Sequence, residues 1–513
     1  MISPKKIILV FPPPTPTERN WQGTPLALLA LSRVLVKENY HIKIYAHHLQ
    51  KNYINEILEN GQDSICLGIS AMTGLQIHEG LKIAKLFKKK FPQIPIVWGG
   101  WHPSILPKET IKNKYVDIVI KGQGDNTFPE LVHALEKNKS LIKIKGLVFK
   151  QKNKIFETPS RPPTDLSKIP PLPYQLVDIE KCVQTTEYGQ RTIQYISSYG
   201  CPHRCAFCVE EIVNKRTWTA VPAKIVIAEW KNLVKKYKVD SIAVYDSNFF
   251  VNEKRVADIC KGILKAKLNI KWGNANGRVG QLSRYKPETW KLMEKSGCSM
   301  ILTGAESGSQ AALDFISKDM NVEEIIKFTK LCKKYKIKIL YSFLVGLPWS
   351  KIPKENDKFV KEEYRSTLNL IDKLLKICNR NRYTYYIFLP YPGAPLFNRA
   401  VELGLKTPKN LDGWSKWLMS PEDPFKETLS QKWINKEDAR LTAMLTQYIF
   451  GIMDRDTFTM LYPRLKNPIS KILFFIGYYI ALLLVTIRWK FKFFKFPVDY
   501  YIFSLIHRYG GIF

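Results

Sequence analysis

The chain has 513 residues, of which 45% are hydrophobic and 24% charged, a balance that excludes wholesale disorder. Its 27 glycines and 31 prolines exclude a collagen-like or Pro/Gly-rich polymer. The net charge of +34 allows nucleic acid, an anionic membrane or an acidic ligand as a partner. Nucleic acid is disfavoured, because the chain has no long basic arm and its lysine runs fall on helix-like stretches with solvated faces.

Residues 1–150 alternate short apolar runs with amphipathic stretches. The apolar runs are Ile7–Phe11, Ile42–Tyr45, Ile65–Ser70, Ile94–Trp98 and Val116–Ile120. Helical patterns lie between them, as at Leu26–Lys37 and His78–Lys89. This alternation predicts a doubly wound parallel sheet, with a ligand at the carboxyl ends of its strands. The loops expected at those ends contain Thr73, Gly99, Gly100, His102, Gly122 and Gly124.

Residues 151–190 are expected to form a linker, because six prolines punctuate them. Residues 191–400 then resume the strand and helix alternation. The strand candidates are Thr192–Ser197, Ser241–Tyr245, Leu268–Trp272, Met300–Thr303, Ile337–Leu344 and Thr384–Leu389. Six strands separated by helical spacers predict all or part of an α/β barrel.

Residues 401–513 are expected to be helical and include an uncharged run of 16 residues at 472–487. Bases and aromatic residues follow this run. A spanning helix needs about 20 apolar residues, so an interfacial segment on a membrane fits better than a span. The alternative is a buried helix of a soluble C-terminal domain.

Three of the nine cysteines, Cys201, Cys205 and Cys208, lie within eight residues in the spacing C-x3-C-x2-C, directly after a predicted strand. The chain opens on strand-like residues and not on a secretory signal, so we expect a cytosolic protein whose clustered cysteines serve metal or redox chemistry. Three thiolates can hold three irons of a cubane and leave the fourth iron open. Zinc is the alternative, with His203 or a distant cysteine as fourth ligand, although no second C-x2-C pair occurs.

The cysteine triplet, with Phe207 before its last cysteine, resembles the signature of the radical S-adenosylmethionine (SAM) superfamily. The resemblance implies a 4Fe–4S cluster whose open iron binds SAM, and a one-electron donor such as flavodoxin or ferredoxin. It also implies that Glu306 accepts hydrogen bonds from SAM and that Arg278 pairs with a carboxylate; the alternatives are a solvated or salt-bridged carboxylate and a structural ion pair. The cofactor-binding residues carried over from the superfamily pattern are Phe207, Asp246, Arg278, Gly304, Glu306, Ser307, Gly308 and Gly346.

The N-terminal domain resembles the cobalamin-binding domain that precedes the radical domain in one large subclass. The matching segments are Val97–Ser104, against G-G-x-H-P-T/S, and Val116–Asp125, against D-x-V-x-x-G-E-G-E. Gln123 and Asp125 replace the two glutamates of the second motif. The resemblance places Thr73, Gly99, Gly100, His102, Gly122 and Gly124 at cobalamin.

His102 is expected to shape its loop more than to ligate cobalt, because the D-x-H-x-x-G motif of histidine-ligated cobalamin proteins is absent. The alternative for the whole domain is a sheet that only scaffolds the barrel.

Together these features predict a flavodoxin-like (Rossmann-type) domain, a linker, a partial six-stranded TIM-like barrel and a helical C-terminal region. The resemblance implies an enzyme that methylates an unactivated carbon of a small-molecule or lipid-like substrate. One alternative is radical cyclisation, oxidation or rearrangement without methyl transfer, as in the anaerobic porphyrin-ring cyclase. The other is a membrane-associated iron–sulfur or cobalamin-binding protein without turnover. We expect a cytoplasmic protein, with peripheral contact to the inner face of the membrane through residues 472–487.

Overall fold

The N-terminal domain contains a seven-stranded sheet in the order β2-β1-β3-β4-β5-β6-β7. The structure is a computed structural model that describes residues 5–14, 23–417, 433–454, 458, 462 and 467–510. The strands are β1 (Lys6–Phe11), β2 (His41–Ala46), β3 (Ser64–Ser70), β4 (Ile96–Gly99), β5 (Ile118–Ile120), β6 (Leu147–Gln151) and β7 (Lys154–Glu157). The first five are parallel, and β6 and β7 are antiparallel additions. The helices are α1 (Leu26–Lys37), α2 (Tyr53–Asn60), α3 (Leu75–Lys90), α4 (Trp101–Ile105), α5 (Pro107–Thr110) and α6 (Thr127–Glu136).

The beginning of the expected linker differs from the prediction, because β7 lies within it. Strands β6 and β7 form a hairpin in which Gln151 pairs with Lys154. The two turn residues, Lys152 and Asn153, both have positive φ, the backbone geometry of a tight two-residue hairpin turn. Glycine usually marks such a turn, and none is present here. The rest of the linker holds only η1 (Tyr174–Leu176) and α7 (Ile179–Cys182) before the barrel begins.

The second domain is a partial barrel of seven parallel strands, of which the short β13 and β14 follow each other directly along the chain, with an antiparallel strand at its first edge. Its strands are β8 (Gln184–Thr186), β9 (Gly189–Tyr195), β12 (Ser241–Val244), β13 (Lys271–Gly273), β14 (Ala275–Asn276), β15 (Met300–Glu306), β16 (Lys338–Val345) and β17 (Arg382–Ile387). A bridge between Trp272 and Cys298 joins its two four-stranded halves, β13-β12-β9-β8 and β14-β15-β16-β17. The expected doubly wound sheet and partial barrel are confirmed.

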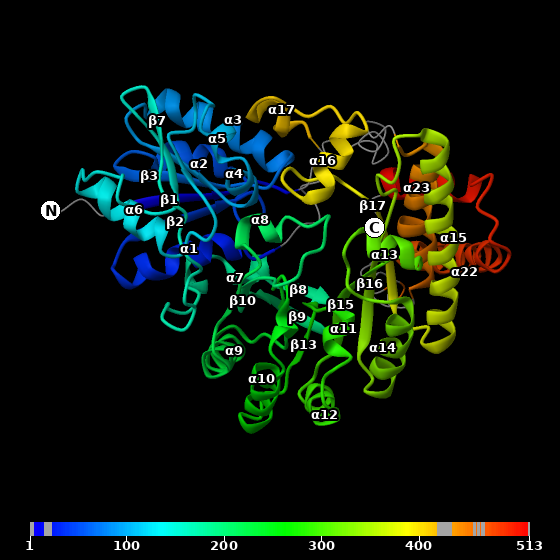
Figure 1. Cartoon of the computed structure of the whole chain (residues 1–513). Coiled ribbons are helices and arrows are strands. Elements are labelled where there is room, and N and C mark those ends of the chain that lie inside the picture. Colours follow the sequence, from blue (N-terminus) through cyan, green and yellow to red (C-terminus); the bar gives the residue numbers. More distant parts are fainter. Residues whose placement is uncertain are drawn as a thin grey trace.

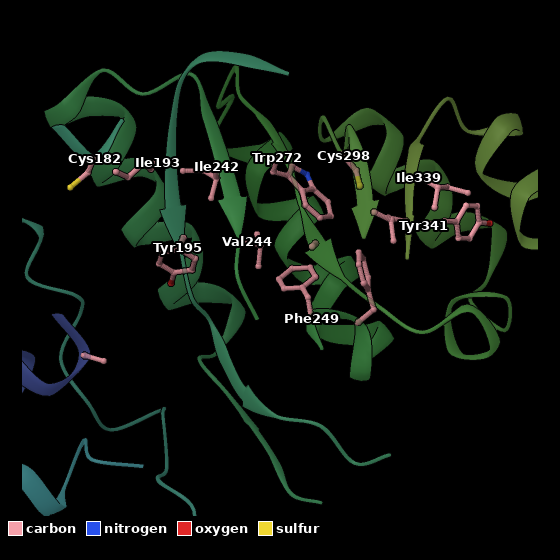
Figure 2. Packing of buried hydrophobic residues seen from close by; sticks show 14 of the residues in the cluster. Cys182, Ile193, Tyr195, Ile242, Val244, Phe249, Trp272, Cys298, Ile339 and Tyr341 are labelled. Atoms are coloured by element: carbon pink, nitrogen blue, oxygen red, sulfur yellow. The ribbon is translucent and has the colours of Figure 1, made fainter. Parts of the chain in front are cut away.

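Helices cover the outside of the barrel, and aromatic side chains fill much of its core. The helices are α8 (Glu210–Asn214), α9 (Ala223–Tyr237), η2 (Phe249–Val251), α10 (Glu253–Lys265), α11 (Val279–Leu282), α12 (Pro287–Lys295), α13 (Gln310–Phe315), α14 (Val322–Lys334), α15 (Pro353–Ile377) and α16 (Pro395–Glu402). Figure 2 shows Trp272, Phe249 and Val244 in this core, and all three are fully buried. Their burial holds the barrel strands in place, and the candidate site described below lies at the carboxyl ends of these strands.

The C-terminal region has two parts that pack in different places. The first, α17 (Leu411–Ser415), returns to the N-terminal domain and lies against α3, where Trp414 is buried (Figure 1). The second packs beside β17 and contains α19 (Lys436–Ala443), η3 (Met444–Ile449), α20 (Phe450–Met453), α22 (Pro468–Phe491) and α23 (Val498–Gly510). The region is therefore helical, as predicted, but it does not form one separate unit.

Helix α22 is longer than the uncharged run that predicted it. It has 24 residues, and only 11% of its most apolar 18-residue window is buried, so length and composition allow it to cross a membrane. The uncharged run is shorter than the helix because Lys471 and Arg488, the charged residues on either side of the run, are part of the helix. The buried-helix alternative does not describe α22, whose outer side chains Ile472, Leu483 and Phe491 are at least 60% exposed.

Candidate active site between the two domains

The loop that carries the three cysteines, residues 201–208, leaves the short strand β10 (Ser198–Gly200), which pairs with β11 (Trp218–Ala220). Gly200 fixes how the chain enters the loop. Its φ is +83°, and a Cβ atom there would lie 2.1 Å from the carbonyl oxygen of Thr217. Only glycine allows this conformation together with this close approach.

The cysteines of this loop differ from most of the others in exposure. Cys201, Cys205 and Cys208 are partly exposed, whereas Cys66 and Cys260, for example, are buried. Burial raises the pKa of Cys208 to about 12, with smaller contributions from the other two thiols. Burial also raises the pKa of Cys201. Iron would offset both shifts, because a metal ion binds and stabilises the thiolate.

The described residues contain no group of three His, Cys, Asp or Glu side chains converging on a single metal ion. A cubane does not need such convergence, because each of its irons takes a different cysteine. The three thiols share one short, partly exposed loop, and the neighbouring thiols help to raise the pKa of Cys201 and of Cys208, so the donor set fits a 4Fe–4S cluster.

Asp246 supports the entry to the cysteine loop. Its carboxylate accepts hydrogen bonds from the backbone N–H of Ser197 at 2.6 Å and from the hydroxyls of Ser197 and Ser198 at 2.7 and 2.6 Å. These contacts hold the end of β9 and the start of β10 together. They assign Asp246 a structural task, and its cofactor contact stays a prediction.

A buried ion pair joins Glu306 to Lys318 beside the cysteine loop. Nζ of Lys318 lies 2.6 Å from Oε1 of Glu306 and 5.7 Å from the centre of the Phe207 ring. Burial alone would lower the pKa of Lys318, but Glu306 and Cys205 outweigh it and raise the pKa. Glu306 is therefore salt-bridged in this structure, which is the alternative stated above. No motif in the sequence singled out Lys318.

Arg278 lies beside the cysteine loop and the Glu306–Lys318 ion pair, and its guanidinium has N–H groups that donate no hydrogen bond to any residue that the structure describes. It is buried, and neither of its terminal nitrogens donates a hydrogen bond within the part of the chain that the structure describes. Nη2 is 3.8 Å from a carboxylate oxygen of Asp319. His203, in the cysteine loop, is close by, since burial and then Arg278 lower its pKa to about 4. Buried guanidinium nitrogens that donate no hydrogen bond fit an anionic ligand group, such as the carboxylate of SAM.

The glycines and serine expected near SAM make close contacts with the protein itself. A Cβ at Gly304 would lie 1.8 Å from Oε1 of Glu306, and one at Gly308 would lie 2.3 Å from the carbonyl oxygen of Ser366. The hydroxyl of Ser307 lies 3.3 Å from that of Thr367 in α15. Gly304 therefore makes room for the ion pair, whereas Gly308 and Ser307 face α15.

Gly346 is held from two sides by residues that no motif pointed to. Its N–H donates to Glu363, at 2.9 Å, and its carbonyl accepts from the indole of Trp433, at 3.0 Å. Burial raises the pKa of Glu363 to about 8. Glu363 and Trp433 thus fix the loop after β16, and the predicted SAM contact of Gly346 stays untested.

A cavity of about 300 Å³ lies where the two domains meet. From the N-terminal domain it is lined by Gly99, Gly100, Gly122 and Gly124, at the carboxyl ends of β4 and β5. From the barrel side it is lined by Ser198, Tyr199, Gly200, Tyr245 and Ser247. The cavity thus reaches Gly200, the residue before Cys201.

The glycines of this cavity fit a bulky ligand. A Cβ at Gly99 would have only Ile120 within 4 Å, at 3.9 Å, and one at Gly122 only the carbonyl oxygen of Val213, at 3.7 Å. Side chains at these positions would fill the space that the glycines leave open. The residues therefore fit cobalamin, whose ring needs close approach to the backbone.

Thr73 and His102 are not among the residues that line this cavity. His102 is fully buried, its Nδ1 lies 3.0 Å from the Thr73 hydroxyl, and its ring packs 5.6 Å from that of Trp414. Burial lowers the pKa of His102 to about 4, so the imidazole is neutral. These contacts agree with a loop-shaping His102, and its cobalamin contact stays a prediction.

Two family models match the chain: the B12 binding domain over residues 18–132 and the Radical SAM superfamily over residues 195–355. An uncharacterized methyltransferase of Pyrococcus horikoshii is 30% identical over 423 residues, which cover 80% of this chain and 86% of the relative. The anaerobic magnesium-protoporphyrin IX monomethyl ester cyclase of Rubrivivax gelatinosus is 25% identical over 66% of this chain and 58% of the cyclase.

Among solved structures, the cobalamin-dependent SAM radical enzyme OxsB, with aqua-cobalamin and SAM bound, has a TM-score of 0.70 and 17% identity. The similarity covers 94% of this chain and 72% of OxsB, and it shows a shared fold. The two family models confirm cobalamin and SAM as cofactors, and the family implies the 4Fe–4S cluster. The chain therefore belongs to the family of cobalamin-dependent radical S-adenosylmethionine methyltransferases.

Proposed function

We propose that this enzyme transfers a methyl group from SAM to an unactivated carbon of a small-molecule or lipid-like substrate. The observation that carries the proposal is the interdomain cavity, which is lined by the cobalamin-side glycines and by Gly200 next to Cys201. Cobalamin in this cavity would lie beside the cysteine loop, so that a substrate between the two would meet both cofactors, as radical formation and methyl transfer in one enzyme require.

Different residues of the site would hold different cofactors. Cys201, Cys205 and Cys208 would hold the cluster, and the glycines around the cavity would hold cobalamin. When bound, these groups supply reductive cleavage of SAM and methyl transfer, respectively. Arg278 would take the carboxylate of SAM, and Lys318 would hold Glu306 where it accepts from the amine or ribose. Burial of both cofactors between the domains would keep water from the reacting groups.

The test uses protein reconstituted with iron, sulfide and hydroxocobalamin without oxygen, then given SAM with a deuterated methyl group, a strong reductant and a cell extract. Methyl transfer predicts both S-adenosylhomocysteine and 5′-deoxyadenosine, together with deuterated methyl groups in extract compounds. Cyclisation or oxidation predicts 5′-deoxyadenosine alone, which would overturn the proposal. Cofactor binding without SAM cleavage would indicate a non-catalytic protein.

Variants in the cysteine loop provide the control for this test. Cys201→Ala, Cys205→Ala and Cys208→Ala should each lose 5′-deoxyadenosine formation and bound iron. Cys378→Ala changes another partly exposed cysteine outside the loop and should retain both. The same assay compares electron donors, because the net charge of +34 favours an acidic one-electron donor such as flavodoxin or ferredoxin.

We propose, as a separate point, that the enzyme works in the cytoplasm and binds the inner face of the membrane through α22 and α23. The support is the exposed apolar side of α22, which includes Ile476 and Leu483, together with exposed Lys490 and Lys495. Arg488 and Lys492, two of the bases that follow the uncharged run, do not contribute to this surface. Arg488 forms an ion pair with Asp499, and Lys492 one with Asp372 at 2.9 Å.

Vesicle sedimentation tests this surface. Vesicles containing anionic phosphatidylglycerol should pull down the full chain, and the double variant Ile476→Asp/Leu483→Asp should stay in solution. The matched control is Ile352→Asp, which changes a side chain that is 54% exposed on another part of the molecule. Equal sedimentation of all three proteins would contradict membrane binding. Sedimentation with vesicles of pure phosphatidylcholine, which carry no net charge, measures the apolar contribution to membrane binding without the electrostatic one.

A further inference from the structure

The loop Gly122–Asp125, on the cobalamin side of the cavity, contacts the barrel on both flanks of the cysteine loop. Asp125 contacts Tyr199, two residues before Cys201. Gln123 contacts Asn214, which lies in α8, the helix that follows Cys208. One short loop of the first domain therefore touches the segments that enter and leave the cluster-binding loop of the second.

The upstream contact is a buried triad of Arg33, Asp125 and Tyr199. Nη2 of Arg33 lies 3.0 Å from Oδ1 of Asp125 and donates to the hydroxyl of Tyr199 at 2.7 Å. The Tyr199 hydroxyl donates in turn to Oδ1 of Asp125 at 3.2 Å. The side chains of Arg33 and Asp125 are each 5% exposed, so their pairing is not weakened by solvent. Each member therefore fixes the position of the other two.

Gly124 lies close against α1. A Cβ at Gly124 would lie 2.4 Å from Cδ2 of Leu31, so the absence of a side chain leaves room for Leu31 beside the loop. That approach brings Asp125 to Arg33, which is also on α1. Gly122 lines the cavity, and a Cβ there would meet only the carbonyl oxygen of Val213, at 3.7 Å. The same four residues thus meet the ligand cavity on one side and the barrel on the other.

The downstream contact is a chain of three polar side chains. Nε2 of Gln123 donates to Oδ1 of Asn214 at 3.0 Å, and Nδ2 of Asn214 donates to Glu210 at 2.7 Å. Oε1 of Gln123 accepts from the backbone of Thr164 at 2.8 Å. Asn214 and Glu210 are both buried, so the chain is held in one arrangement. Glu210 is two residues after Cys208 and ties this chain to the end of the cysteine loop.

We propose that Gln123 and Asp125 are positioning residues that couple occupancy of the cobalamin site to the order of the cysteine loop. A ligand that settles against Gly122 and Gly124 immobilises the loop Gly122–Asp125, and the two contacts transmit that order to residues 201–212, which do not line the cavity. In this coupling, ligand binding at the first domain makes local unfolding of the cysteine loop rarer. Such an effect requires no change in the average structure of the loop. This inference rests on the proposed function, since it presupposes that cobalamin binds in the cavity.

Hydrogen exchange measured by mass spectrometry tests the coupling without an activity assay. The cluster-loaded protein is compared with and without hydroxocobalamin, kept without oxygen, at a concentration that saturates each variant by absorbance. In the wild type, hydroxocobalamin should slow exchange within residues 118–128 and, by about fivefold or more, within residues 201–212. Tyr199→Phe and Gln123→Leu should keep the first effect and reduce the second to less than about twofold.

The variants differ in how much they disturb the protein. Tyr199→Phe removes one hydroxyl and retains the ring, so it tests the coupling even if Gln123→Leu fails to load iron. The matched control is Gln50→Leu, which removes two hydrogen bonds between the Gln50 side chain and the backbone of Ala46 and Ile44 in the first domain, and should behave as the wild type. Protection of residues 201–212 that persists in both variants, or that is absent from the wild type with hydroxocobalamin bound, would overturn the coupling alone. Failure of the wild type to bind hydroxocobalamin would overturn the proposed function as well.

Discussion

The ammonium of Lys318 lies 2.6 Å from the Glu306 carboxylate, and the two side chains are 8% and 7% exposed. Glu306 itself has a φ of +61°, an unfavourable conformation for a residue with a side chain. The bulge at the end of β15 and the absence of a side chain at Gly304 turn its carboxylate back toward Lys318. The result is a fixed carboxylate beside the cysteine loop, where the amine or ribose of SAM is expected.

Replacing Lys318 by methionine should destabilise the protein, because it leaves the Glu306 carboxylate buried without its partner. Breaking a buried ion pair from one side costs about 3–5 kcal/mol. The double variant Lys318→Met/Glu306→Gln should recover part of that loss, since no unpaired charge is left. Chemical denaturation of the wild type, both single variants and the double variant measures the coupling. Additive effects would show that the two side chains do not interact.

Replacing Arg278 by glutamine should weaken SAM binding. A hydrogen bond to a charged group contributes about 1.5–3 kcal/mol, so the Kd for SAM should rise by roughly 10-fold to 100-fold. Isothermal titration of cluster-loaded protein measures this change. Arg284→Gln is the control, because Arg284 is exposed on the same stretch of chain and should leave the Kd unaltered. A Kd that is the same in both variants would make Arg278 a structural residue.

Replacing Gly200 by alanine should disturb the entry to the cysteine loop. The added methyl group meets the carbonyl oxygen of Thr217 at a backbone φ of +83°, and we expect a loss of stability of more than about 2 kcal/mol. Iron bound after reconstitution should fall as well. Gly477→Ala is the matched control, because nothing lies within 4 Å of the added atom and α22 should gain up to about 1 kcal/mol.

His102 should make the protein sensitive to acid. Burial lowers its pKa to about 4, so between pH 6.5 and pH 4 the folded state binds fewer protons than the unfolded state. The stability present above pH 6.5 is therefore lost as the pH falls, by about 3 kcal/mol for this one group. His102→Gln should remove that part of the pH dependence, measured by denaturation at pH 7 and pH 4. His78→Gln, at an exposed position, should not.

Several features of this protein follow from the sequence because they depend on local patterns. The predicted helix Leu26–Lys37 has the same bounds in the structure, because its apolar periodicity is continuous. The cysteine triplet indicated iron–sulfur chemistry because its three ligands lie within eight residues. The order of strands and helices then predicted both domains, because strand–helix alternation permits few topologies. Each of these inferences needs only residues that are close along the chain.

Only the tertiary structure decided which side chains meet around the site. Arg33 and Tyr199 are separated by 166 positions, and Trp433 bonds Gly346 across 87. Lys318 carries no motif, and its role depends on burial against Glu306 and Cys205. Such pairings arise when packing removes charged and polar groups from water and forces them to find partners in neighbouring elements. Local sequence determines which elements form, whereas the packing of distant elements determines these contacts.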